Sequence, residues 1–386
     1  MRISEKLGDR RIAIDSLCIT AKIFNNRLIS DRLLAGQLAV NVPDNFDRWR
    51  RANAARISTA PPTEVRAVHA CADWPDVTAI AHPAQDPPQS AFKARPAASW
   101  GTRARAFVSM TRPSVVGLVF FTGVPALAIN DGQWPQWSLS AAILTGVALC
   151  ACASSVFNAW LERDLDAKME RTRNRPLPTG LVAPSAALAW AWLLAIFGCL
   201  ILLAYGGWAG CVAGAATIAF YVIVYTIWLK PRTPLNIVIG GAAGAAPPLI
   251  VDAALNGSIG WQSLNMFVLV FLWTPPHFWA ISLFRTSDYA NAGLPMLPLT
   301  HGSAHTRLRM LQYAISMVPF AIFPAVSRSL SLGYGLFALA VSIWFVIVCL
   351  RLYRHDSEPG ARKVFAASLI YLHAVFAAMT VDLLLH

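Results

Sequence analysis

Mostly apolar runs of about 20 residues recur from residue 113 to the C-terminus. A helix of about 20 residues is roughly 30 Å long, which matches the hydrocarbon thickness of a bilayer. The chain of 386 residues is 56% hydrophobic and only 13% charged, about half the charge of an ordinary soluble domain. We therefore predict an all-α, polytopic membrane protein with nine transmembrane helices, at 114–131, 138–161, 184–204, 208–228, 235–254, 263–284, 308–327, 332–350 and 364–385.

Lys and Arg are distributed very unequally between alternate connections. On one side of the membrane fourteen Lys and Arg residues fall in the connections 162–182, 229–234, 285–309 and 351–363. The connections on the other side hold only Arg328. Because cytoplasmic loops are rich in Lys and Arg, this bias predicts a cytoplasmic N-terminus and a periplasmic C-terminus. The same bias accounts for the net charge of +12, so we expect no nucleic-acid partner.

Residues 1–95 differ from the rest in being rich in Arg and Pro without a long apolar run. Such a composition is typical of disorder, so we predict a poorly structured N-terminal extension before a membrane domain at 96–386. No signal peptide is visible, and acidic residues such as Glu5, Asp9 and Asp15 are atypical of a mitochondrial presequence. These features favour a bacterial inner membrane over a mitochondrial one.

The stretch NAWLERDLDAKMERTRNRPLPTG, residues 158–180, places many charges between two apolar runs. If the helix continues past the membrane surface, Asn158, Glu162 and Asp166 share one helical stripe, and Asp164 points elsewhere. Oxygen ligands of this kind suit Mg²⁺ that also binds phosphates. Arg171 and Arg175 could bind phosphate oxygens. The alternative is an ordinary surface loop with paired acids and bases, but a polar Asn inside an apolar run is costly and usually functional.

A second polar set follows the sixth predicted span. The positions of His277, Arg285 and Asp288 place them on one face, if a single helix continues through them. Pro275 and Pro276 precede the histidine and would free backbone carbonyls. A histidine in a membrane helix can also simply bond to a neighbouring helix.

A third polar segment lies between the fourth and fifth predicted spans, where Lys230 and Arg232 add positive charge at the same membrane face. The small residues at 240–246 that follow allow either close helix packing or room for a bulky ligand. Acids, Mg²⁺ and Arg above an apolar interior suit an isoprenyl diphosphate, whose allylic C–O bond would ionise to a carbocation and a diphosphate anion.

These three segments resemble the UbiA-type intramembrane prenyltransferases. The first resembles the pattern N-x3-E-x3-D followed by M-x-RT-x-x-RPL; the second contains PHFWA, R-x-x-DY and PMLP; the third contains NIVIGGAAGA. The resemblance covers about residues 105–385 and implies a UbiA-type helical bundle. Within the family, the segments are most similar to members that farnesylate protoheme IX.

The resemblance implies farnesyl diphosphate as donor and heme B as acceptor, with heme O and diphosphate as products. It implies Mg²⁺ held by Asn158, Glu162, Asp166 and Asp288, with Arg171 and Arg175 as further catalytic residues. It implies substrate contacts from Lys230, Arg232, Arg285, His277 and Tyr289. Heme A synthase or terminal oxidase assembly factors are the implied protein partners, and the lipid bilayer the surroundings. An aromatic or quinone-precursor acceptor, and a transporter or heme chaperone, remain alternatives.

Overall fold

The computed structural model describes residues 99–230, 232–233, 235–291 and 294–385, apart from the side chain of Asn291. The extension predicted at 1–95 lies outside them. Over this described part the chain forms helices and connections without a strand. In chain order the elements are α5 (Trp100–Met110), α6 (Pro113–Gly123), the 3₁₀ helix η3 (Pro125–Leu127), α7 (Trp137–Leu161), α8 (Arg163–Asp166), α9 (Pro184–Ala219), the π-helix η4 (Phe220–Leu229), α10 (Asn236–Ala245), α11 (Pro247–Asn256), α12 (Trp261–Phe284), α13 (Thr286–Asn291), α14 (Leu297–Val326), α15 (Leu332–Arg354) and α16 (Glu358–Leu385).

Seven helical stretches in the described residues are long and apolar enough to cross a membrane. One of them, Pro184–Leu229, has 46 residues, which is about 70 Å at the α-helical rise and more than twice the hydrocarbon thickness. Gly207 interrupts this stretch with φ 63° and ψ −170°, a backbone conformation that glycine adopts readily and residues with a Cβ rarely adopt. A Cβ on Gly214 would lie 2.7 Å from Leu202, so the chain reverses at Gly207 and its two arms pack side by side.

The N-terminal side of the bundle contains a bent helix pair. The stretches Trp100–Met110 and Pro113–Leu127 meet at 48° and together are long and apolar enough to form one broken span. With this pair counted as one span, the described residues hold up to eight candidate spans, against the nine predicted. The difference lies in Pro184–Leu229, which the prediction divides into two spans near Gly207. The sequence did not predict α5, which precedes the expected first span.

Small residues set how closely α7 and α9 pack. A Cβ on Gly146 of α7 would lie 2.8 Å from Leu202, and one on Gly198 of α9 would lie 3.0 Å from Cys150. Glycines at such contacts allow close helix approach where lipid supplies no hydrophobic drive for association. This packing fixes α7, whose last turn carries Asn158.

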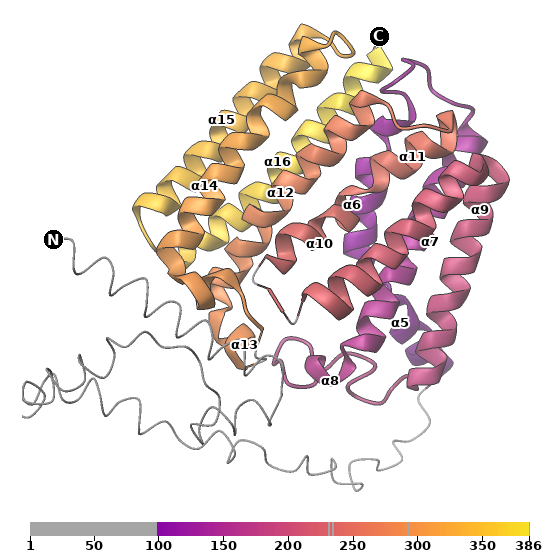
Figure 1. The fold of residues 1–386 in the computed structure, drawn as a ribbon, viewed down its shortest axis with the longest axis vertical. Coiled ribbons are helices and arrows are strands. Elements are labelled where there is room, and N and C mark those ends of the chain that lie inside the picture. Colours follow the sequence, from indigo (N-terminus) through magenta and orange to yellow (C-terminus); the bar gives the residue numbers. More distant parts are fainter. Residues whose placement is uncertain (1–98, 231, 234, 292–293, 386) are drawn as a thin grey trace, which may run out of the picture. The chain divides into compact units, whose positions relative to one another are not determined.

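The charged connections gather at one end of the bundle. Figure 1 shows α5, α8 and α13 at the end opposite the C-terminus. Arg105, Arg163 and Arg285 lie on or beside these helices. The bundle therefore has one strongly basic end, in keeping with the unequal distribution of Lys and Arg between alternate connections.

Candidate active site

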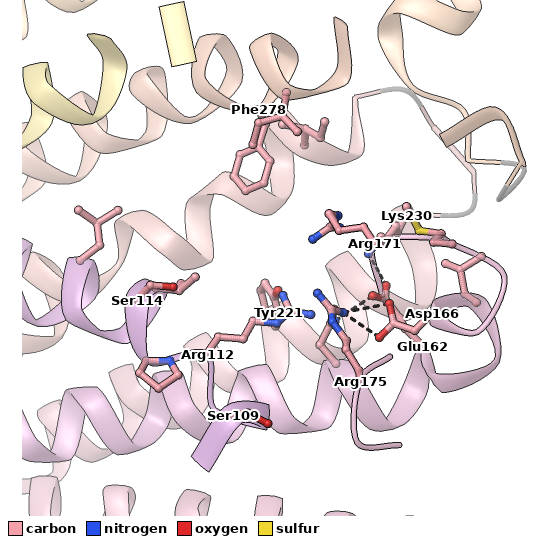
Figure 2. Close-up of a pocket in the computed structure, with 18 of the residues that line it drawn as sticks. Ser109, Arg112, Ser114, Glu162, Asp166, Arg171, Arg175, Tyr221, Lys230 and Phe278 are labelled. Atoms are coloured by element: carbon pink, nitrogen blue, oxygen red, sulfur yellow. Dashed lines mark hydrogen bonds and ion pairs between the residues drawn. The ribbon is translucent and has the colours of Figure 1, made fainter. Parts of the chain in front are cut away.

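A cavity of about 1070 Å³ opens at this basic end. Residues of α5, α6, α7, α8, η4, α10, α12, α13 and α16 line it, together with the connection that follows α8 and the segment before α14. Its charged lining consists of Glu162, Asp166, Arg105, Arg112, Arg171, Arg175 and Lys230, so cations outnumber acids by five to two. Figure 2 shows Glu162, Asp166, Arg171, Arg175 and Lys230 gathered together, with Ser114 and Phe278 apart from them. The cavity therefore joins a cationic region to a more apolar one.

The predicted stripe of Asn158, Glu162 and Asp166 is present and lines the cavity. The α-helix ends at Leu161, yet the N–H of Glu162 donates to the carbonyl of Asn158 at 2.9 Å. The N–H of Asp166 in turn donates to the carbonyl of Glu162 at 2.7 Å. These helical bonds carry the stripe across the break. All three residues are buried, whereas the side chain of Asp164 is 85% exposed, as its position on another face predicts.

Each of the two buried carboxylates is paired with a cation from another segment. Lys230 forms an ion pair with Oε1 of Glu162, and Asn158 Nδ2 donates to its Oε2 at 2.9 Å. Arg175 Nη1 donates to Oδ2 of Asp166 at 2.8 Å and lies 3.0 Å from Oδ1. The pairs tie η4 and the connection after α8 to the end of α7.

Arg175 and Arg112 both line the cavity. Burial, with the nearby positive charge of Arg112, lowers the pKa of Arg175, and the bond to Asp166 acts in the opposite direction. Arg112 itself adopts a left-handed backbone conformation, with φ 54° and ψ 67°, directly before Pro113. This conformation is uncommon for a residue with a Cβ and tends to occur at functional sites. Arg112 and Arg105 were not predicted as site residues.

The π-helix η4 carries one face of the cavity. Its bonding from residue i to i+5 is seen where the N–H of Lys230 donates to the carbonyl of Tyr225 at 2.9 Å. Tyr221, Tyr225 and Lys230 all line the cavity. The ammonium of Lys230 also lies 5.8 Å from the centroid of the Tyr225 ring. Segments of π-helix are rare and often lie at functional sites. No sequence pattern predicts this one.

Arg285 and Asp288, two charged residues that the sequence predicted for the site, do not line the cavity. The helix that carries His277 ends at Phe284, and Arg285 has φ −124° and ψ 25° before α13 begins. The prediction that one helix face carries His277, Arg285 and Asp288 is therefore wrong. Arg285 Nη1 lies 3.6 Å from Asp288 Oδ2, and the Arg285 side chain is 45% exposed. Tyr289 does line the cavity.

Arg232 also lies away from the cavity lining. Its Nη1 donates to the carbonyl oxygens of Trp228 and Ile227 at 2.8 and 3.1 Å. Carbonyls at the end of a helix lack helical partners, and cations are favourable there. The exposed Arg232 side chain therefore caps η4.

His277 lies on α12 and lines the cavity. The residues of the two ion pairs, Lys230 with Glu162 and Arg175 with Asp166, come from other segments of the chain. It is buried, and its Nδ1 is 2.7 Å from the hydroxyl of Ser368 on α16. Phe278, Ile281, Phe365 and Leu369 line the cavity beside it. This part of the cavity is apolar and aromatic, with a single imidazole among the described lining residues.

The small residues at 240–246 serve close packing at two positions. A Cβ on Gly240 would overlap the ring of Tyr225, and one on Gly241 would lie 2.9 Å from Thr274. A Cβ on Gly244 would meet nothing within 4 Å. The packing alternative therefore holds at Gly240 and Gly241.

The fold and the sequence relatives define the class of protein. A model of the UbiA prenyltransferase family matches residues 119–373, and the chain belongs to this family. Among its relatives is a protoheme IX farnesyltransferase of Brucella ovis, 42% identical over 285 residues that cover 73% of this chain and 91% of the relative. Another of the same name, from Rhodopseudomonas palustris, is 41% identical over 281 residues, or 72% of this chain and 89% of the relative.

Solved structures support the same fold. A structure of a digeranylgeranylglyceryl phosphate synthase in membranes matches with a TM-score of 0.63 at 16% identity, over 74% of this chain and all of that chain. A UbiA homolog from Archaeoglobus fulgidus bound to DMAPP and Mg²⁺ matches with a TM-score of 0.52 at 14% identity, over 71% and 99%. The predicted all-α UbiA-type bundle is therefore confirmed.

Proposed function

We propose that this chain transfers the farnesyl group of farnesyl diphosphate to a vinyl group of protoheme IX, giving heme O and diphosphate. The observation that carries the proposal is the 42% identity to protoheme IX farnesyltransferases, which extends over 91% of their length. The cavity supports it because it combines a cationic region with an apolar region that contains an imidazole.

The diphosphate of the donor would bind among Arg112, Arg171, Arg175 and Lys230. Arg guanidinium groups recognise phosphate oxygens through paired N–H donors. In the structure Arg175 and Lys230 are already paired with Asp166 and Glu162. Arg105, Arg112 and Arg171 form no ion pair with any described residue. These three cations would supply the first attraction for an anionic substrate.

The residues at the end of α7 fit Mg²⁺. The amide oxygen of Asn158 and the carboxylates of Glu162 and Asp166 are hard oxygen donors that line one cavity. Among the described residues no group of three or more His, Cys, Asp or Glu could hold a metal alone. The three oxygen donors at the end of α7 therefore suit an ion that takes its other ligands from substrate phosphates, as Mg²⁺ commonly does. Bound there, Mg²⁺ would stabilise the negative charge of the leaving diphosphate.

In the proposed reaction the allylic C–O bond of farnesyl diphosphate breaks, and its electron pair leaves with the diphosphate. The guanidinium groups of Arg171 and Arg175 would stabilise this developing negative charge. The vinyl group of the porphyrin attacks the allylic carbon and forms the new C–C bond. Water then adds to the resulting cation and loses a proton, which leaves the hydroxyl group of heme O. Apolar walls near Phe278 would exclude water until the C–C bond has formed.

We further propose a bacterial inner-membrane location with the cavity mouth facing the cytoplasm. The basic end of the bundle carries this mouth, and Lys and Arg are enriched on the cytoplasmic side of membrane proteins. Farnesyl diphosphate, whose charged group requires an aqueous approach, would then enter from the cytoplasm.

The acceptor is the part of the proposal that an experiment can test most sharply. Purified protein in lipid vesicles would receive farnesyl diphosphate and Mg²⁺ with either heme B or 4-hydroxybenzoate, and products would be identified by mass spectrometry. We expect heme O and no prenylated benzoate. Prenylated benzoate without heme O would reject the heme acceptor in favour of an aromatic one.

A further inference from the structure

The side-chain amide of Asn158 is contacted by two other side chains. Its Nδ2 donates to Oε2 of Glu162 at 2.9 Å. The hydroxyl of Thr226, which lies on η4, donates to its Oδ1 at 3.2 Å. Asn158 and Glu162 line the cavity, whereas Thr226 is buried and is not part of the lining. Thr226 therefore contacts a residue of the cavity wall without lining the cavity itself.

These two contacts determine which way the Asn158 amide points. A carboxylate can only accept, so the NH₂ group of the amide faces Glu162, and the oxygen Oδ1 faces Thr226. Two oxygens at this distance attract each other only when a proton lies between them, and the Thr226 hydroxyl supplies that proton. The bond uses one of the two lone pairs of Oδ1, so the other remains for a cation.

The π-helical backbone of η4 directs the Thr226 hydroxyl. The hydroxyl also donates to the carbonyl oxygen of Tyr221, five residues earlier, at 2.8 Å. In an α-helix a threonine hydroxyl reaches the carbonyl three or four residues earlier, as Thr217 of α9 does with Ala213 at 2.8 Å. The spacing of five follows the wider turn of a π-helix. One proton is thereby shared between two acceptors, an arrangement that is common at helix ends.

We propose that Thr226 is a positioning residue of the cavity: its hydroxyl keeps the amide of Asn158 turned so that Oδ1 serves as a ligand of Mg²⁺. The inference rests on the proposed function, which supplies the ion and the diphosphate. Without the hydroxyl the amide is held by Glu162 alone and is free to swing away from the orientation that a ligand needs. Groups that orient a metal ligand commonly contribute about 10–100-fold to metal affinity.

Variants of Thr226 and Thr217 form a matched set. Thr226→Val keeps the branched shape and removes the hydroxyl, whereas Thr226→Ser keeps the hydroxyl and removes a methyl group. Thr217→Val removes a hydroxyl that bonds to a backbone carbonyl of the adjoining helix α9, and Thr217 does not line the cavity. A loss that came only from a weaker bond within the helix would therefore appear in both valine variants.

The test is calorimetric titration of inorganic diphosphate into the purified full-length protein, once with excess Mg²⁺ and once with a chelator. We expect Mg²⁺ to strengthen diphosphate binding by the wild type. Thr226→Val should weaken the binding measured with Mg²⁺ by about tenfold or more, the usual effect of removing an outer partner of a metal ligand. Thr226→Ser and Thr217→Val should bind as the wild type does.

The titration with chelator separates loss of the metal ligand from damage to the whole site. Without the ion, Thr226→Val should bind diphosphate as the wild type does, because the cavity cations such as Arg112 and Arg171 are unchanged. Three results would overturn the inference: unchanged binding with Mg²⁺ in Thr226→Val, an equal loss with and without the ion, or an equal loss in Thr217→Val. A wild type whose diphosphate affinity does not depend on Mg²⁺ would also overturn it.

Heme O formation by the wild type, measured separately, tells failure of this inference from failure of the proposed function. If the wild type forms heme O while its Mg²⁺-dependent binding does not depend on Thr226, the inference fails and the function stands. If the binding depends on Thr226 but no heme O forms, the positioning of Asn158 stands and the proposed function fails.

Discussion

Arg175 binds the buried carboxylate of Asp166, with Nη1 2.8 Å from Oδ2. Asp166 is the last residue of α8, and Arg175 lies nine residues further along the connection to α9, so their pairing folds the connection back over the end of α7. The Asp166 side chain is only 4% exposed and that of Arg175 is 28% exposed. Two groups of opposite charge are thereby held at the cavity wall, one suited to Mg²⁺ and the other to phosphate oxygens.

Removing the charge of Asp166 should nearly abolish turnover. We expect Asp166→Asn to lower the rate of heme O formation by about 100-fold or more, the scale seen when a group that stabilises transition-state charge is removed. Asp164→Asn is the control, because this neighbouring side chain is 85% exposed and does not line the cavity. Turnover assays on equal amounts of membrane-inserted protein would check the difference, and equal activity in the two variants would contradict the assignment.

Lys230 and Arg232, two cations close in sequence, should differ in effect. Lys230 pairs with Glu162 in the cavity wall, whereas Arg232 donates to carbonyls at the end of η4. We therefore expect Lys230→Gln to raise the KM for farnesyl diphosphate and Arg232→Gln to leave it unchanged. Steady-state kinetics at varied donor concentration would measure both. A raised KM in Arg232→Gln alone would return this residue to the substrate site that the sequence predicted for it.

Arg112 should contribute to donor binding although no helical pattern pointed to it. Its side chain lines the cavity, and it forms no ion pair with another described residue. We expect Arg112→Gln to weaken inhibition by inorganic diphosphate, because a cation available to phosphate is lost. Arg103→Gln on α5 is the control, since Arg103 is exposed and lies outside the cavity lining. Inhibition constants that change equally in both variants would indicate only a general surface-charge effect.

Gly240 and Gly244 offer a test of packing behind the cavity. A Cβ at Gly240 would overlap the ring of Tyr225, which lines the cavity, and one at Gly244 would meet nothing within 4 Å. We expect Gly240→Ala to lower stability by about 1–3 kcal/mol, as overpacking does, and to reduce activity as Tyr225 moves. Thermal unfolding in detergent and turnover would both be measured. Wild-type values for Gly240→Ala, or an equal loss in Gly244→Ala, would count against the close contact.

The sequence predicted the parts of the site that depend on helical period. Asn158, Glu162 and Asp166 lie on one stripe because backbone bonds from i to i−4 persist past Leu161. The predicted spans also fall on described helices, since span length and connection charge are set by the bilayer. These features are local, and a periodic pattern is enough to find them.

Features that depend on tertiary contacts or on breaks in a helix could not be predicted in this way. The change of backbone at Arg285 ends the helix before Asp288, so their sequence spacing does not place Asp288 beside His277. The π-helical bonding of η4 and the left-handed backbone of Arg112 have no composition signal. Ser368 reaches Nδ1 of His277 only because α16 packs against α12 at this level.

The most direct measurement is product formation by the purified protein in lipid vesicles, supplied with farnesyl diphosphate and heme B, with and without Mg²⁺. The proposed function predicts a product with the mass of heme O when Mg²⁺ is present and little or none when the ion is removed by a chelator. Absence of heme O with both substrates and Mg²⁺ present would contradict it, and equal yields with and without the ion would contradict the role given to Asn158, Glu162 and Asp166.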